Sequence, residues 1–439
     1  MADSHLLPAD RNGRPPVSVV VPFRGGQEAA GQLSLALERL RTRSGDELLI
    51  VSNNEADVVG DLLSGVCEVV PARDHASSYY ARNVGAERAK NEWILFMDAD
   101  CEPASDVLDA YFEAPVKREH GALAGEIEPA GRGLLARWAD SRGLLRQAVN
   151  LNHPYRPSAV TANLLVRSEA WRAIGGFQEG IRSGGDGDFC WRMQAAGWEL
   201  GRRPSARVRH AHRERLRPLA GQLARHAAGA SWLNRRYPGS SPRPRLLRDL
   251  FRDLAGAIVW LFSARFESAV FKAVDAVAAT STAWGYNLSN FSPRQVPPRS
   301  APDVTLVFGS FPSKQEAVQM ARSLSTGSDT RVVAFGRPKQ PVIGGLRGLH
   351  VEFREDAAMF RRASCLARLV VRHPVRCLRD LYLRRGGDSG TASLAAMAVS
   401  AQGISTRGRI DDRLGDASPA EAARLLNLLG VKQGGSTKR

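Results

Sequence analysis

Two carboxylates directly follow an apolar run in this sequence, and they are the first residues whose spacing indicates chemistry. The run Trp93–Met97 has the pattern of a buried strand, and it ends in Asp98-Ala99-Asp100. Residues two apart on an extended chain point the same way, so Asp98 and Asp100 should face one site if the extended geometry persists. Ligands of open α/β sheets bind beyond the carboxyl ends of strands. The pair suits Mg²⁺ or Mn²⁺ holding a phosphorylated substrate, and its structural alternative is a pair of turn or helix-capping acids.

A second acidic segment lies further along the chain and is rich in glycine. Gly175-Gly176-Phe177 is followed by Ser183-Gly184-Gly185-Asp186-Gly187-Asp188. Glycines of this density permit close backbone approach and a mobile loop. The structural alternative is a turn in which Asp188 caps the helix that begins near Phe189.

The elements that must position these acids alternate between strand and helix from Val17 to about Tyr237. This alternation predicts an α/β fold with a mostly parallel sheet and helices on both faces. The predicted strands are Val17–Pro22, Glu47–Val51, Glu68–Val70, Trp93–Met97, Ala122–Glu128 and Ala159–Val166, and the predicted helices are Gln27–Arg41, Ser78–Lys90 and Leu134–Val149.

The order of these features resembles the family 2 glycosyltransferases, which have the GT-A fold. The resemblance covers residues 17–237 and depends on several separate motifs. Val19-Val20-Val21-Pro22-Phe23-Arg24 is similar to the opening strand at which the nucleotide base docks. Ala81-Arg82-Asn83-Val84-Gly85 matches the family's A-R-N-x-G, and Asp98-Ala99-Asp100 matches its D-x-D.

The resemblance implies a role for each of these residues. Binding of a nucleotide diphosphate-sugar of the UDP, dTDP or GDP type is implied for Pro22, Arg24, Asn53, Arg82, Asn83, Asp98 and Ala99. Asn53 and Asn54 stand where the family usually has an acidic residue that contacts the uracil or ribose. Asp100 is implied as the contact to Mg²⁺ or Mn²⁺, which would neutralise the diphosphate leaving group.

The glycine-rich segment is similar to the family's G-G-F…G-E-D block. Asp186 then stands at the position of the general base, which takes a proton from the acceptor hydroxyl, with Asp188 as the alternative. The sequence departs from the block at Gly185, where the family usually has Glu. A histidine that follows the base commonly completes the metal or diphosphate site, and between His210 and His212 we favour His210.

The rest of the chain divides into further parts. We expect an N-terminal tail (1–16), a GT-A domain (17–237), a helical segment with a Pro-rich linker (238–300) and a truncated Rossmann-like α/β unit (301–439). This last unit resembles the N-terminal half of a family 4 glycosyltransferase. The helical segment is interpreted as a pair of packing helices, and the alternative is a basic amphipathic surface on an anionic membrane.

Composition limits the location and the partners. The net charge is +16, but no basic motif is interleaved with aromatic residues, so nucleic acid is not an expected partner. The five cysteines are widely separated, which favours a reducing compartment over a disulfide framework. With no apolar leader and no run of about 18 apolar residues, we expect a cytoplasmic protein; peripheral contact with the inner membrane face belongs to the alternative interpretation of the helical segment.

Taken together, the sequence predicts a metal-dependent inverting glycosyltransferase of cell-envelope polysaccharide synthesis, with a carbohydrate or lipid-linked acceptor. The residues also leave three alternatives open. A non-catalytic nucleotide-sugar or glycan-binding protein on the same scaffold is one. A nucleotidyltransferase would need a basic Gly-rich loop, of which Arg24-Gly25-Gly26 is only a trace. A nucleic-acid binder is the third.

Overall fold

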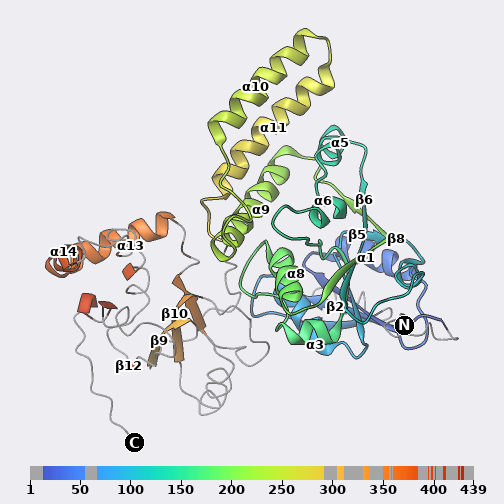
Figure 1. Ribbon diagram of the computed structural model, residues 1–439, viewed down its shortest axis with the longest axis horizontal. Coiled ribbons are helices and arrows are strands. Elements are labelled where there is room, and N and C mark those ends of the chain that lie inside the picture. The colour runs from blue at the N-terminus through green and yellow to red at the C-terminus, as the bar shows by residue number, and fades with distance from the viewer. Residues whose placement is uncertain are drawn as a thin grey trace, which may run out of the picture. The chain divides into compact units, whose positions relative to one another are not determined.

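The chain forms two compact units in a computed structural model, residues 1–296 and residues 297–439 (Figure 1). The structure describes residues 13–54 and 67–290 of the first unit. Of the second it describes 304–310, 330–336, 350–354, 357, 359–383, 394, 397–398, 401, 409–411, 424–425 and 427–429. Most of the expected tail (1–12) and of the Pro-rich linker (291–303) therefore lies outside the described residues.

The first unit is built on an eight-stranded sheet with the order β3-β2-β1-β4-β7-β6-β8-β5. Its strands are β1 (Val17–Phe23), β2 (Glu47–Ser52), β3 (Glu68–Pro71), β4 (Trp93–Met97), β5 (Cys101–Pro103), β6 (His120–Ala130), β7 (Asn163–Arg167) and β8 (Glu199–Ala211). The predicted α/β class is confirmed, and the sheet is mixed, with four parallel strand pairs and three antiparallel ones among the described residues. Antiparallel pairs join β4 to β7, β7 to β6 and β8 to β5.

Strand β1 is buried on both faces, as the apolar sequence of this segment predicts. Val19 and Val21 pack in one core with Ala30 and Leu33 of α1 (Gln27–Glu38). Val20 points to the opposite face, where α3 (Ser78–Arg88) covers the sheet. Helices therefore cover both faces of the sheet's N-terminal half.

Two predicted elements differ clearly from the structure in extent, and one long strand was not predicted. The single helix expected over 134–149 is divided into α5 (Leu134–Ser141) and α6 (Gln147–Leu151), with Leu145 at φ 63° in the break. Strand β7 begins at Asn163, later than expected. Strand β8 was missed because its arginines give little apolar alternation.

Short helices complete the first unit before a helical extension begins. They are α4 (Val107–Ala110), α7 (Ser168–Ala173) and α8 (Gly185–Ala195). The extension consists of α9 (Leu216–Arg236), α10 (Leu246–Phe262) and α11 (Phe266–Gly285). Figure 1 shows α10 and α11 as a long antiparallel hairpin that projects away from the sheet. None of the described helices is long and apolar enough to span a membrane.

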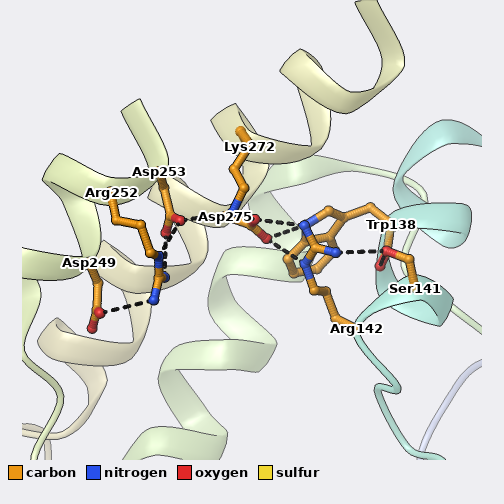
Figure 2. Close-up of polar contacts among 8 residues, drawn as sticks. All are labelled: Trp138, Ser141, Arg142, Asp249, Arg252, Asp253, Lys272 and Asp275. Carbon is orange, nitrogen blue, oxygen red and sulfur yellow. Dashed lines mark hydrogen bonds and ion pairs between the residues drawn. The ribbon is translucent and has the colours of Figure 1, made fainter. Parts of the chain in front are cut away.

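Helix α11 fixes the hairpin to the rest of the unit by close packing and by ion pairs. Helix α11 crosses α9 at Gly285, where a Cβ atom would lie 2.1 Å from the Ala224 carbonyl oxygen. Asp275 of α11 accepts hydrogen bonds from Trp138 Nε1 at 2.9 Å and from Arg142 Nη2 at 2.7 Å (Figure 2). The hairpin thus has a defined direction relative to α5.

The second unit contains a four-stranded parallel sheet with the order β11-β10-β9-β12. The strands are β9 (Val304–Ser310), β10 (Thr330–Gly336), β11 (His350–Phe353) and β12 (Arg409–Asp411), and two helices are α13 (Met359–Arg372) and α14 (Pro374–Leu383). The strands expected at 304–309 and 330–335 are confirmed. The helix expected over 314–325 lies outside the described residues.

Candidate active site

A cavity of about 570 Å³ lies where the ends of β4 and β8 meet α3, α8 and α9. Its volume is in the range of sites for small ligands. The cavity brings together five of the residues that the sequence singled out, namely Arg82, Asp98, Asp100, Asp186 and His210. These residues are spread between positions 82 and 210 of the sequence, so only the tertiary fold brings them together.

Asp98 lies in the turn that joins β4 to β5 and not on an extended strand. The Cys101 amide donates to the Asp98 carbonyl oxygen at 3.1 Å, which closes this turn. The Asp98 carboxylate pairs with the guanidinium of Arg82, whose side chain is only 4% exposed. Arg82 comes from the A-R-N-x-G segment on α3, so the first two predicted motifs meet in one ion pair.

Asp100 faces the same cavity and contacts His210 on the neighbouring strand. Strand β5 pairs with β8 so that Cys101 lies opposite His210, which brings His210 Nε2 to 3.2 Å from Asp100 Oδ1. Arg213 Nη2 lies 3.6 Å from the other carboxylate oxygen. Burial opposes the charge on Asp100, but His210 and Arg213 outweigh it and lower the pKa of this carboxyl group.

The chemistry of this donor set fits a divalent cation that accepts both oxygen and nitrogen ligands. Asp100, Cys101 and His210 each place one ligand atom within 4.8 Å of the others. Cys101 is a poor ligand for a hard ion, because burial raises the pKa of its thiol well above the usual value. The buried Nδ1 of His210 has no hydrogen-bond partner in the described structure. A carboxylate and an imidazole therefore remain, which suits Mn²⁺ better than an all-oxygen site would.

Asp186 lines the cavity from the first turn of α8. Its Oδ1 accepts a hydrogen bond from Thr161 Oγ1 at 2.9 Å, which orients the carboxylate. Burial raises the pKa of Asp186, and the charge of Arg82 only partly opposes this effect. A carboxylate whose pKa is raised is a better proton acceptor than an ordinary aspartate.

The glycine that departs from the family pattern has a steric reason in this fold. A Cβ atom at Gly185 would lie 2.7 Å from the ring of Tyr79 on α3. The Tyr79 ring also lies 5.5 Å from the Arg82 guanidinium carbon in a cation–π arrangement. An acidic side chain at position 185 therefore has no room beside Asp186 while Tyr79 is present.

Asp188, the alternative base, is bound in a buried network. Its side chain is fully buried and contacts Arg192 Nε and Arg236 Nε, both at 2.8 Å. The Tyr237 hydroxyl donates to it at 2.8 Å as well. Asp188 is not among the residues that line the cavity. This arrangement gives Asp188 a structural role and leaves Asp186 as the aspartate of this segment that faces the cavity.

The structure does not bring the other predicted nucleotide-binding residues into the cavity lining. Asn83 holds the Gly175-Gly176-Phe177 loop, since its side chain donates to the Phe177 carbonyl and accepts from the Phe177 amide, both at 2.9 Å. Asn53 donates to the Ala72 and His75 carbonyls. Pro22, Arg24 and Ala99 lie in β1, just after β1 and in the β4–β5 turn, respectively.

Sequence reasoning missed a group of basic residues on the cavity wall, namely Arg182, Arg213, Arg225 and His226. Burial and the charge of Arg213 lower the pKa of Arg225, and burial and the charge of Arg225 lower that of Arg182. Burial lowers the pKa of His226 to about 4, so its imidazole is neutral at neutral pH.

Comparison with known proteins shows what this part of the chain is similar to. Residues 93–289 match the family model described as glycosyl transferase family group 2. The pre-mycofactocin glycosyltransferase of Mycobacterium tuberculosis is 28% identical over 247 residues, which are 54% of this chain and 51% of that protein. Glycosyltransferase AglE of Haloferax volcanii is 26% identical over 196 residues, which are 42% of this chain and 64% of that protein.

The mannosyltransferase PcManGT from Pyrobaculum calidifontis, solved in complex with GDP-Man and Mn²⁺, superposes with a TM-score of 0.46. It is 17% identical, and the match covers 64% of this chain and 91% of that one. The chain spans about half the length of the first curated relative. The family-model match ends at residue 289, so the expected resemblance of 301–439 to family 4 stays a prediction. Residues 93–289 are thus similar to the family 2 glycosyltransferases, and the relatives match about half of this chain or less.

Proposed function

We propose that this chain transfers a sugar from a nucleoside diphosphate-sugar to an acceptor hydroxyl, with inversion at the anomeric carbon and with a divalent cation. The observation that carries the proposal is a single cavity that holds two separate acidic functions. Asp98 and Asp100 lie beside His210 at the ends of β4 and β8, and Asp186 comes from α8. Inverting transfer needs such a separation, because the base and the leaving group act on opposite faces of the sugar.

Asp100 and His210 would hold Mg²⁺ or Mn²⁺, which neutralises negative charge on the departing diphosphate. Arg82 is oriented by Asp98 and adds a fixed positive charge to this part of the cavity. Asp98 is thereby available to the ribose side of the donor through its other carboxylate oxygen. The implied donor is of the UDP, dTDP or GDP type.

Arg182, Arg213 and Arg225 add positive charge to the cavity lining, and of these three only Arg213 has an ion pair among the described residues, with Asp100. Arg182 donates to the Ser289 carbonyl oxygen, which leaves its charge uncompensated by that contact. Positive side chains that depress one another's pKa values are stabilised when an anion binds between them. We assign them to the diphosphate and to any anionic group on the acceptor.

Asp186 would take the proton of the acceptor hydroxyl as that oxygen attacks the anomeric carbon. Thr161 fixes the direction of the carboxylate, and burial, which raises the pKa of Asp186, makes this carboxylate a stronger base than an ordinary aspartate. The proton moves from the acceptor oxygen to Asp186, the new glycosidic bond forms, and the bond to the diphosphate breaks.

A thermal-shift screen of nucleoside diphosphates and their sugars, with and without Mn²⁺, tests the donor and the cation together. We expect the melting temperature to rise for one nucleotide and more strongly with Mn²⁺, because a ligand that binds only the folded state stabilises it. The donor identified in this way is then incubated with a panel of glycan and lipid-linked acceptors. Donor binding without turnover across the panel would favour a non-catalytic binding protein instead.

A further inference from the structure

Helix α10 presents an apolar stripe to solvent instead of to a neighbouring helix. Leu247, Phe251, Leu254, Ile258 and Phe262 recur at intervals of three or four residues, so they share one face of the helix. They are 84%, 78%, 52%, 56% and 87% exposed, respectively. The interpretation as two packing helices accounts for the inner face of the hairpin but not for this outer one. An exposed patch of this size marks an interaction surface.

The apolar surface continues around the tip of the hairpin and along its flank. Phe266 at the start of α11 is 65% exposed, and Val259 and Leu261 are 60% and 53% exposed. Trp284, near the other end of α11, is 59% exposed. Large aromatic and aliphatic residues therefore occur at the tip and at the base of the hairpin.

The acidic residues of the hairpin are ion-paired, whereas three of its arginines are exposed without an ion pair in the described part of the chain. All four acidic residues of the hairpin have ion-pair partners. Asp249 and Asp253 contact Arg252, Asp253 and Asp275 contact Lys272 (Figure 2), and the exposed Glu267 contacts Arg137 of α5. Arg245, Arg248 and Arg265 are exposed, and none of them has an ion pair among the described residues. The stripe is therefore flanked by excess positive charge, which is the pattern of a helix that lies on an anionic lipid surface.

The anchor of the hairpin also connects this surface to the candidate active site. Arg142, which binds Asp275, lies three positions before Leu145, and Leu145 lines the cavity. Asn150 of α6 lines it as well. The segment that fixes the direction of the hairpin therefore also forms part of the cavity rim.

We propose that the α10–α11 hairpin is a peripheral docking surface for an anionic lipid bilayer. The apolar stripe of α10 inserts into the headgroup region, and Arg245, Arg248 and Arg265 contact lipid phosphates. Because no described helix can span a bilayer, the hairpin lies in the plane of the interface. The proposal does not depend on the transfer reaction, so each can fail alone.

Vesicle flotation with the full chain tests the docking surface. The vesicles contain phosphatidylcholine alone or phosphatidylcholine mixed with phosphatidylglycerol. The Phe251→Ser/Phe262→Ser variant should bind anionic vesicles at least about tenfold more weakly than the wild type. The Arg248→Glu/Arg265→Glu variant should lose the preference for anionic over neutral vesicles. Calorimetric binding of a nucleoside diphosphate with Mn²⁺ should be unchanged in both, because neither pair lines the cavity.

Two matched control variants replace exposed apolar residues elsewhere: Leu35→Ser on α1, and Val371→Ser/Leu378→Ser on α13 and α14. Both variants should bind vesicles like the wild type. Wild-type protein that does not bind anionic vesicles overturns the proposal, and so does loss of binding only in the α13–α14 control. Light scattering on protein that elutes from a size-exclusion column measures the molar mass and so shows whether the chain forms a dimer. A dimer that dissociates in the Phe251→Ser/Phe262→Ser variant, without vesicle binding by the wild type, would instead assign the stripe to a second copy of this chain.

Discussion

Asp186 and Asp188 are two residues apart, and the structure predicts that neutralising them has different effects on stability. Asp186 is a carboxylate whose charge burial disfavours, and Asn at this position can still accept the hydrogen bond from Thr161. Asp188 is a fully buried carboxylate that compensates the charges of Arg192 and Arg236. The Asp186→Asn variant should therefore fold at least as stably as the wild type, and the Asp188→Asn variant should not.

The magnitude for Asp188→Asn follows from the partners that it leaves behind. Removing one side of a buried ion pair costs about 3–5 kcal/mol of unfolding free energy. Since 1 kcal/mol shifts the melting temperature by about 2–4 °C in a domain of this order of size, we expect a fall of at least about 6 °C. The Asp186→Asn variant should instead lose about 10²–10⁴-fold in transfer rate, the usual contribution of a general base.

The sign of the pH effect gives an independent check on Asp186. Its pKa is higher in the folded than in the unfolded protein, so its ionisation weakens the fold as the pH rises through the folded-state pKa. Thermal melts of the wild type and Asp186→Asn should therefore coincide well below pH 4 and diverge near neutral pH, with the variant higher. An Asp186→Asn variant that melts as far below the wild type as Asp188→Asn does, or that retains full transfer activity, would refute this reasoning.

Three further predictions follow from neighbouring residues. The pKa of His226 falls from 6.5 to about 4 on folding, so the wild type should lose up to about 3 kcal/mol of unfolding free energy as the pH falls from 6.5 to 4. The His226→Gln variant should remove most of this loss in thermal melts at acid pH. Gly185→Glu should lower the melting temperature through its clash with Tyr79, and the Tyr79→Ala/Gly185→Glu double variant should recover part of it; equal losses in both would contradict the steric reason for Gly185. Asp100→Asn should weaken Mn²⁺ binding measured by calorimetry by at least about tenfold, whereas Cys101→Ala should bind Mn²⁺ like the wild type; the reverse order would show that the thiol is the ligand.

The first four strands of the fold were predictable because their apolar runs are local in the sequence. Trp93–Met97 and Val17–Phe23 are buried on both faces, so their composition differs sharply from that of the flanking turns. Strand β8 escaped prediction because its arginines lie on an exposed face, and its pairing with β5 and β6 decides its structure. The mixed direction of the sheet depends on these long-range pairings in the same way.

The sequence by itself determined which residue types were available to the site: Asp98, Asp100 and Asp186 were recognisable from their spacing and their neighbours. Only the tertiary structure decided their partners. The register of β5 with β8 places His210 beside Asp100, and the packing of α3 on α8 puts Tyr79 where a residue 185 side chain would lie. Likewise, the apolar period of α10 was visible in the sequence, but its exposure was not. Periodicity is a local property of the chain, whereas burial depends on which distant segments pack against it.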